Sequence, residues 1–167
     1  MTVALLLALP AAAAETKKPP PSASAKAGPV AIGKFDDWTA AKYPESGQTV
    51  CYAFTRVQTS APSVAGRGSV VLTVTQRPAG RDAVAIEAGL AYPANTTVTV
   101  QVDQTGLDFY TTGRNAFARE GKAAVAAFNK GSRAIARSPA PKEVTDTFSL
   151  KGFGQAYAAT VKACPAK

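Results

Sequence analysis

The 167-residue chain contains no histidine, and this absence removes a large part of familiar protein chemistry. Imidazole is the side chain that titrates near neutral pH and a frequent ligand of zinc and iron. Ser-His and Cys-His nucleophile pairs are therefore ruled out. The two cysteines are too few for a zinc ribbon or an iron–sulfur cluster. The composition argues against most enzymes, and we expect no metal ion and no cofactor.

The common catalytic and nucleotide-binding motifs are also missing. The chain has no Gly-x-Gly-x-x-Gly, no phosphate-binding Gly-Lys-Ser/Thr loop and no Gly-x-Ser-x-Gly elbow. Asp36 and Asp37 are adjacent, but neighbours on a strand point to opposite faces, so a role in a turn or at a strand start beside Trp38 is favoured. Ser149 and Lys151 would form a catalytic dyad only if the lysine were buried. A histidine-free hydrolase is thus the least favoured hypothesis.

The N-terminal segment has the pattern of an export signal. Residues 1–14 carry no charge and end in three small residues, and their apolar run is shorter than the roughly 20 residues that span a bilayer. We interpret them as a signal-peptide remnant, with a buried N-terminal helix as the alternative. Residues 15–31 contain four prolines and predict an extended Pro/Ala/Lys-rich linker. A single domain is expected over residues 32–167 of an exported protein, which is periplasmic, associated with the outer membrane or secreted.

The two cysteines support export. Cys51 and Cys164 lie far apart in the sequence, and an even pair in an exported chain predicts a disulfide rather than two separate buried thiols. In the chain-entropy description, closing so long a loop stabilises a fold by on the order of 4 to 5 kcal/mol.

Alternation of apolar and polar residues dominates the middle of the chain. Val98, Val100 and Val102 share one face of a strand. Two stretches change to helical spacing: residues 122–130, and residues 153–164, where one stripe carries Cys164 inward. We therefore expect a mainly β fold, a β-sandwich or partly open β-barrel with two short helices, the C-terminal one tethered by the disulfide. The other strands are expected at residues 35–43, 50–54, 70–74, 84–90, 107–112, 115–119, 132–138 and 144–150, and the inward stripe of the second helix comprises Phe153, Tyr157, Val161 and Cys164.

One carboxylate breaks the apolar pattern. Asp146 shares its strand face with Val144 and Phe148, so the alternation points it inward. Either an arginine or backbone donors satisfy it, or the strand begins later than expected. A structural role is favoured over a ligand site.

Positive charge is concentrated in one segment. The chain has a net charge of +8, and residues 114–142 hold seven cations and one anion, Glu120. A basic face attracts polyanions, so we expect an acidic envelope component or an acidic protein as partner, with peripheral outer-membrane association as a further option and a solvated basic face as the alternative. Nucleic acid is not expected, because exposed aromatic residues do not interleave with these cations. The candidate surface for an anionic partner comprises Arg114, Arg119, Lys122, Lys130, Arg133, Arg137 and Lys142.

An ordered set of short motifs resembles the invasion-associated locus B protein family. The motifs lie at residues 35–38, 48–52, 107–113, 116–119, 129–132 and 145–153, followed by Cys164. The family often has an acidic residue and a tryptophan where this chain has Arg114-Asn115 and Phe117. The resemblance implies an exported protein of alphaproteobacteria, periplasmic or associated with the outer membrane. Some members are linked to host-cell entry, and no catalytic residues carry over.

The leading hypothesis is a non-enzymatic cell-envelope protein that acts by binding, in host-cell interaction or invasion. The alternative is a structural or stress-related periplasmic protein without a specific ligand. The sequence leaves the oligomeric state open.

Overall fold

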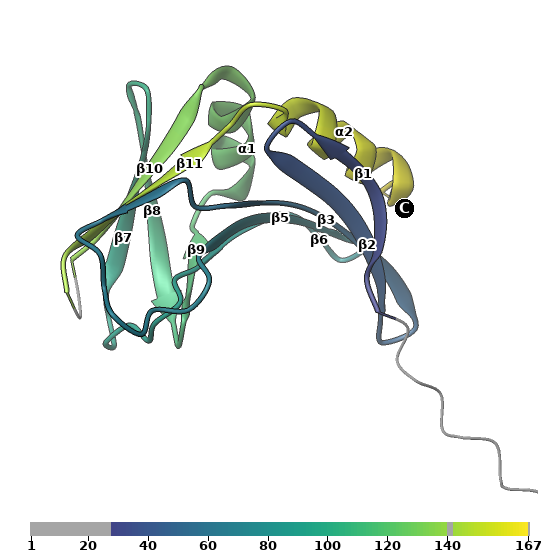
Figure 1. The fold of residues 1–167 in the computed structure, drawn as a ribbon. Coiled ribbons are helices and arrows are strands. Elements are labelled where there is room, and N and C mark those ends of the chain that lie inside the picture. The colour runs from purple at the N-terminus through teal and green to yellow at the C-terminus, as the bar shows by residue number, and fades with distance from the viewer. Residues whose placement is uncertain (1–27, 140–141, 167) are drawn as a thin grey trace, which may run out of the picture.

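The computed structural model describes residues 28–139 and 142–166, which form two helices and one eleven-stranded antiparallel sheet (Figure 1). The sheet is strongly curved and open, with β1 and β4 at its two edges. This confirms the expected mainly β fold with two short helices, and it shows one open sheet. The strand order is β1-β2-β3-β5-β6-β9-β8-β7-β10-β11-β4. The elements are β1 (Val30–Phe35), β2 (Trp38–Glu45), β3 (Gln48–Arg56), β4 (Thr59–Ala61), β5 (Val71–Arg77), β6 (Gly80–Glu87), β7 (Thr97–Val102), β8 (Thr105–Thr112), β9 (Asn115–Ala118), α1 (Gly121–Lys130), β10 (Arg133–Ser138), β11 (Val144–Ser149) and α2 (Phe153–Ala163).

The first part of the sheet differs from the expectation. The stretch 35–43 is not one strand, because a tight turn at Asp36-Asp37 separates β1 from β2. Asp36 has a φ of 46°, a left-handed conformation that aspartate tolerates better than most residues. β1 begins at Val30, inside the segment expected to be linker. β4 was not expected, because three residues are too few to show an alternating pattern.

The core lies between the helices and the inner face of the sheet, the face on which both helices pack. Buried side chains alternate along β5, β7 and β10, as the sequence pattern indicated. Trp38 is fully buried; its Nε1 donates to the Ser149 carbonyl oxygen over 2.9 Å, and its ring centroid lies 4.8 Å from that of Phe153. Figure 1 shows both helices on one side of β3, β5 and β6, and we call the opposite side the outer face.

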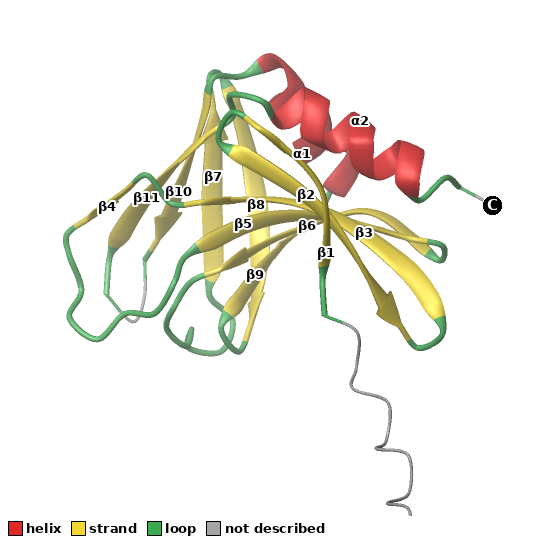
Figure 2. Cartoon of the chain, turned by 45° about the vertical axis from the view of Figure 1, so that its right-hand side comes forward, coloured by secondary structure: helices red, strands yellow, loops and turns green. Residues whose placement is uncertain are grey.

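Helix α2 packs on β1, β2 and β3 (Figure 2). Its buried stripe is rotated from the expected one: Ala156 and Thr160 are fully buried, whereas Tyr157 and Val161 are half-buried. Alanine and threonine face the sheet because small side chains allow close approach of helix and strands. Cys164 faces inward as predicted.

The predicted disulfide between Cys51 and Cys164 is present, with a Cα–Cα distance of 5.9 Å. It joins β3 to the C-terminal end of α2. The bond therefore holds the last helix against the sheet.

Within residues 28–139 and 142–166, the helices are too short or too polar for any of them to cross a bilayer. The same residues contain no group of three or more acidic or cysteine side chains placed to hold a metal ion.

Candidate functional site

The inward carboxylate of Asp146 is held by a buried arginine. Arg67, from the loop between β4 and β5, donates from Nη1 to Oδ1 over 2.8 Å and from Nη2 to Oδ2 over 2.7 Å. The Ser60 hydroxyl donates to Oδ1 over 2.7 Å, and Arg67 Nε donates to the Ala88 carbonyl oxygen over 2.7 Å. The two charged side chains are 7% and 1% exposed. Of the alternatives left open by the sequence, arginine pairing is confirmed, and the pair serves to fix the loop onto the sheet.

A second polar network joins the sheet to α2, next to the start of α1. Asp82 Oδ1 accepts hydrogen bonds from Gln76 Nε2 over 2.8 Å and from the Tyr157 hydroxyl of α2 over 2.7 Å. Burial, followed by the hydrogen bond to Asp82, raises the pKa of Tyr157 to about 12. Gly121, at the start of α1, lies so close to the Asp82 carbonyl oxygen that a Cβ atom would overlap it. The network therefore holds α2 against the sheet, and the close approach at Gly121 places the start of α1 beside it.

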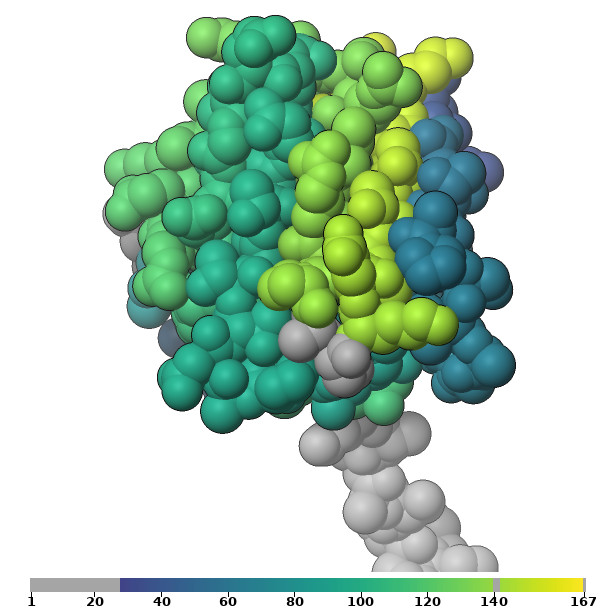
Figure 3. Space-filling model, turned by 90° about the vertical axis from the view of Figure 1, so that its left-hand side faces the viewer, coloured from purple at the N-terminus to yellow at the C-terminus, as the bar shows by residue number. Residues whose placement is uncertain are grey.

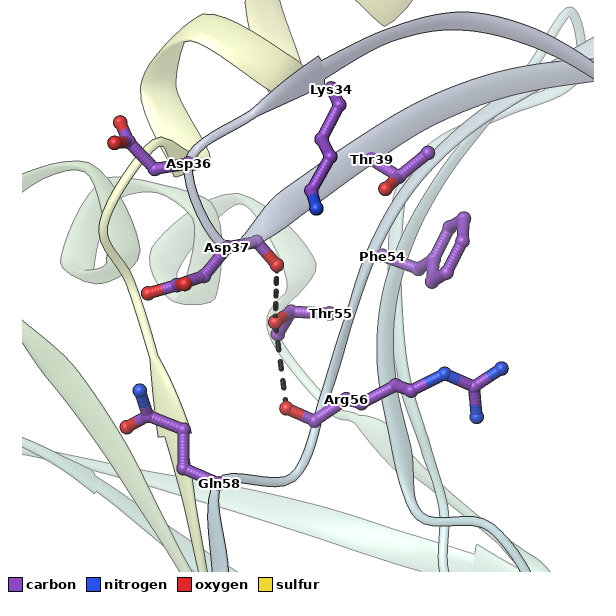
Figure 4. Close-up of a pocket in the computed structure, with 8 residues that line it drawn as sticks. All are labelled: Lys34, Asp36, Asp37, Thr39, Phe54, Thr55, Arg56 and Gln58. Carbon is purple, nitrogen blue, oxygen red and sulfur yellow. Dashed lines mark hydrogen bonds between the residues drawn. The ribbon is translucent and has the colours of Figure 1, made fainter.

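A hollow of about 340 Å³ lies beside the β1–β2 turn and the end of β3 (Figure 4). The carboxylates of Asp36 and Asp37 point to one side, whereas the Phe54 ring and the Arg56 guanidinium lie on the other. Asp36 pairs with Lys151 Nζ at 3.3 Å, and the Lys151 side chain is 74% exposed. Figure 4 draws the two carboxylates apart from each other, so they do not converge on one site. Lys151 is exposed, whereas a Ser149–Lys151 dyad would need it buried. The lining residues are Lys34, Asp36, Asp37, Thr39, Phe54, Thr55, Arg56 and Gln58.

The outer face carries a row of aligned side chains that sequence analysis missed. Cross-strand register places six residues side by side, one from each of β2, β3, β5, β6, β9 and β8. We call them the outer strip: Thr39, Phe54, Thr73, Ala85, Phe117 and Tyr110. The three aromatic members, Phe54, Phe117 and Tyr110, alternate along their strands with buried side chains, so they point away from the core. That alternation was visible in the sequence, but the register that aligns them was not.

The rings of the outer strip lie in two groups. Tyr110 and Phe117 stack with centroids 5.6 Å apart, and Phe54 stacks on Tyr52 of the neighbouring row at 5.8 Å. Tyr110 is 43% exposed, and the Arg119 guanidinium carbon lies 5.7 Å from its ring centroid. Thr39 and Phe54 also line the hollow, so the hollow forms one end of the strip.

The seven predicted cations are spread over several elements. Arg133 and Arg137 share the outer face of β10, and their register partners on β7 and β11 include Thr99 and Thr145. Figure 3 shows this face, with β10 and β11 in green to yellow between β7 and β4. None of the ion pairs within the described residues includes either arginine. The others lie elsewhere: Arg114 in the β8–β9 turn, Arg119 after β9, Lys122 and Lys130 on α1, and Lys142 before β11.

The β8–β9 turn anchors one of these cations. Arg114 donates from Nη2 to the Gly89 carbonyl oxygen over 2.8 Å. Its guanidinium is therefore partly committed to holding the neighbouring loop. The structure brings Arg133 and Arg137 together on one exposed face, and these two form the part of the predicted surface that a partner could contact jointly.

Comparison with known proteins agrees with this fold. The model of the invasion associated locus B (IalB) protein family matches residues 38–161. A crystal structure of invasion associated protein B from Bartonella henselae superposes with a TM-score of 0.57 at 17% sequence identity, covering 80% of this chain and 96% of that one. No curated protein sequence matches. At this identity the structural likeness shows a shared fold, whereas the family model matches most of the sequence, including Trp38 and the stretch from β10 to α2. The chain belongs to the invasion-associated locus B family.

Proposed function

We propose that the chain is an exported, non-enzymatic protein of the cell envelope that acts by binding an acidic partner through the outer face of β10. The observation that carries this proposal is the pair Arg133 and Arg137, both exposed on that face and outside the ion pairs of the described residues. Membership of a family that is not known for enzymatic activity supports a binding role. The disulfide supports an oxidising compartment outside the cytoplasm.

The spacing of the two arginines suits an extended anionic surface. The two arginines are four positions apart on the strand, which places their Cα atoms roughly 13 Å apart. Between and beside them lie neutral side chains, Ile135 on β10 and threonines on β7 and β11. Guanidinium groups bind carboxylates and phosphates in a bidentate manner, and exposed pairs of this kind are screened by salt. Binding should therefore weaken as ionic strength rises.

We further propose that the acidic partner is contacted during interaction with host cells. The protein from Bartonella henselae is described as invasion associated. Its likeness to this chain is one of fold, so host contact needs its own measurement, a comparison of host-cell entry with and without the gene.

Binding to isolated envelope fractions, titrated with salt, tests the proposed surface. Arg133→Glu/Arg137→Glu should lower affinity by about tenfold or more at low salt and remove most of the salt dependence. The matched control is Lys122→Glu/Lys130→Glu, which makes the same charge change on α1. Unchanged affinity of the β10 variant, or equal loss in the control, would contradict the assignment. Normal host entry with weakened envelope integrity after gene deletion would instead favour the structural or stress-related role.

A further inference from the structure

We infer that the outer strip binds an extended acidic glycan, which crosses the strands from the hollow at Lys34 and Arg56 to Arg119. This inference goes beyond the proposed function, because it concerns other strands and names a ligand class. It rests on the shape of the strip, the chemistry of its side chains and the placement of charge at its ends.

The strip is long and narrow. Its six residues lie on six adjacent strands, so five strand spacings of about 4.8 Å give a length of roughly 24 Å. One row of outward-facing residues flanks the strip on each side, and the strip together with these two rows is roughly 13 Å wide. The flanking rows comprise Ala41, Tyr52, Thr75, Ala83, Arg119 and Asp108 on one side, and Arg56, Val71, Glu87, Asn115 and Thr112 on the other.

These dimensions favour a single extended chain over a folded partner. The strip offers roughly 300 Å², whereas stable protein interfaces bury about 800 Å² on each partner. A second copy of this protein is therefore not its expected occupant. An extended peptide binds best at a sheet edge, where it finds free backbone groups, and the backbone groups beneath the strip are already paired within the sheet.

The side chains of the strip match the surface of a sugar. Pyranose rings have apolar C–H faces, which pack against aromatic rings, and hydroxyl groups around their edges. The strip supplies rings at Phe54, Phe117 and Tyr110, and hydroxyl groups that both donate and accept at Thr39 and Thr73. Ala85, between the two aromatic groups, leaves room for a bulky unit.

Charge at the two ends favours an acidic glycan. Lys34 and Arg56 lie at the hollow, where the carboxylates of Asp36 and Asp37 point away from the Phe54 side (Figure 4). Arg119 lies over the Tyr110 ring at the other end. The six residues between these cations are uncharged, and two exposed carboxylates, Glu87 and Asp108, stand in the flanking rows. A nucleic acid, with a phosphate on every unit, fits this neutral middle less well than a glycan with spaced carboxylates.

Titration calorimetry with acidic oligosaccharides tests the inference. The probes are hexasaccharides of galacturonate and of hyaluronan, with their trisaccharides as length controls and cellohexaose as the neutral control. We expect at least one acidic hexasaccharide to bind more tightly than its trisaccharide and than cellohexaose. Tyr110→Ala and Phe117→Ala should each weaken binding by about tenfold.

The matched control is Ile135→Ala, a half-buried apolar residue on the outer face of β10, away from the strip. It should leave glycan binding unchanged. Phe117 is half-buried, so its replacement can also lower the stability of the fold. Arg119→Gln and Tyr110→Ala, the latter at an exposed residue, are expected to leave the stability unchanged, and thermal unfolding checks this. The inference is overturned if no acidic hexasaccharide binds, if cellohexaose or a single-stranded oligonucleotide binds as tightly, or if Ile135→Ala causes the same loss. The variants of the β10 surface are separate, so either proposal can fail alone.

Discussion

Asp146 occupies a position of β11 where alternation alone would place an apolar side chain. A buried carboxylate is stable only when its charge is paired and its lone pairs are used, and Arg67 and Ser60 together do this. The sequence predicted the direction of the carboxylate and its need for donors. It could not identify Arg67, because the two residues are 79 positions apart and meet only through the path of the β4–β5 loop.

Replacing Arg67 should therefore destabilise the protein strongly. Arg67→Met keeps much of the apolar stem but leaves the Asp146 carboxylate buried without its counter-charge, and we expect a loss of about 3 to 5 kcal/mol in the free energy of unfolding. Urea unfolding measures it. The control is Arg77→Met, whose ion pair with Glu45 is about two-fifths exposed and should contribute less than about 1 kcal/mol. Equal effects of the two substitutions would refute a special role for the buried pair.

Tyr157 should make stability depend on alkaline pH. Burial and the hydrogen bond to Asp82 raise its pKa from the ordinary 10.0 to about 12. As pH rises above 10, the unfolded chain releases this proton before the folded one, so stability falls between about pH 10 and 12 and is unaffected at lower pH. Unfolding measured across this range should show a shallower decline for Tyr157→Phe than for the parent, and Tyr110→Phe is the control. An identical slope in both variants would show that other groups control the decline.

At the scale of elements, local patterns predicted most strands and both helices. Strands such as β7 and β10 were predictable because alternation is a property of neighbouring residues. A turn or strand start at Asp36-Asp37 was favoured from the sequence, and the turn is present; the single strand expected over residues 35–43 was wrong because apolar residues continue on both sides of that turn. The pairing of β6 with β9 and of β7 with β10 could not be deduced, because it depends on contacts between distant segments. The outer strip depends on the register of six strands, and for that reason it was beyond sequence analysis.

The start of α2 depends on a glycine that no other residue can replace without strain. Gly152 has a φ of 85°, and a Cβ atom there would overlap the Phe35 carbonyl oxygen at the β1–β2 turn. Gly152→Ala should cost about 1 to 2 kcal/mol for the backbone conformation and a further amount for the overlap. Gly113→Ala, with a φ of 58° and open space around it, should show the conformational cost alone. Thermal unfolding of the two variants separates these contributions. Equal losses of stability would show that the β1–β2 turn moves to accommodate the added Cβ atom at no measurable cost.

At the scale of the whole molecule, an open sheet needs its ends held in place. β1 and β4 are edges, and the described residues connect them to the rest of the structure in different ways. Ser60 on β4 contacts the buried Asp146, whereas α2 covers β1 and β2 and is fixed to β3 by the disulfide. The C-terminal helix thus holds the β1 edge of the sheet in place, and the buried Arg67–Asp146 pair, with Ser60, holds the β4 edge.

Removing the disulfide should loosen this side first. The bond joins residues 113 positions apart, and Cys51→Ala/Cys164→Ala should lower the free energy of unfolding by about 4 kcal/mol in the chain-entropy description. Hydrogen exchange should rise in α2 before it rises in β7, because the helix is then held against the sheet by packing on β1, β2 and β3 and by the Tyr157–Asp82 hydrogen bond, without a covalent link. A reductant provides the control: it should lower the stability of the parent to that of the double variant and leave the double variant unchanged. If the parent keeps its unfolding midpoint in reductant after the thiols are shown to be free, the disulfide does not stabilise the fold and α2 is held by packing alone.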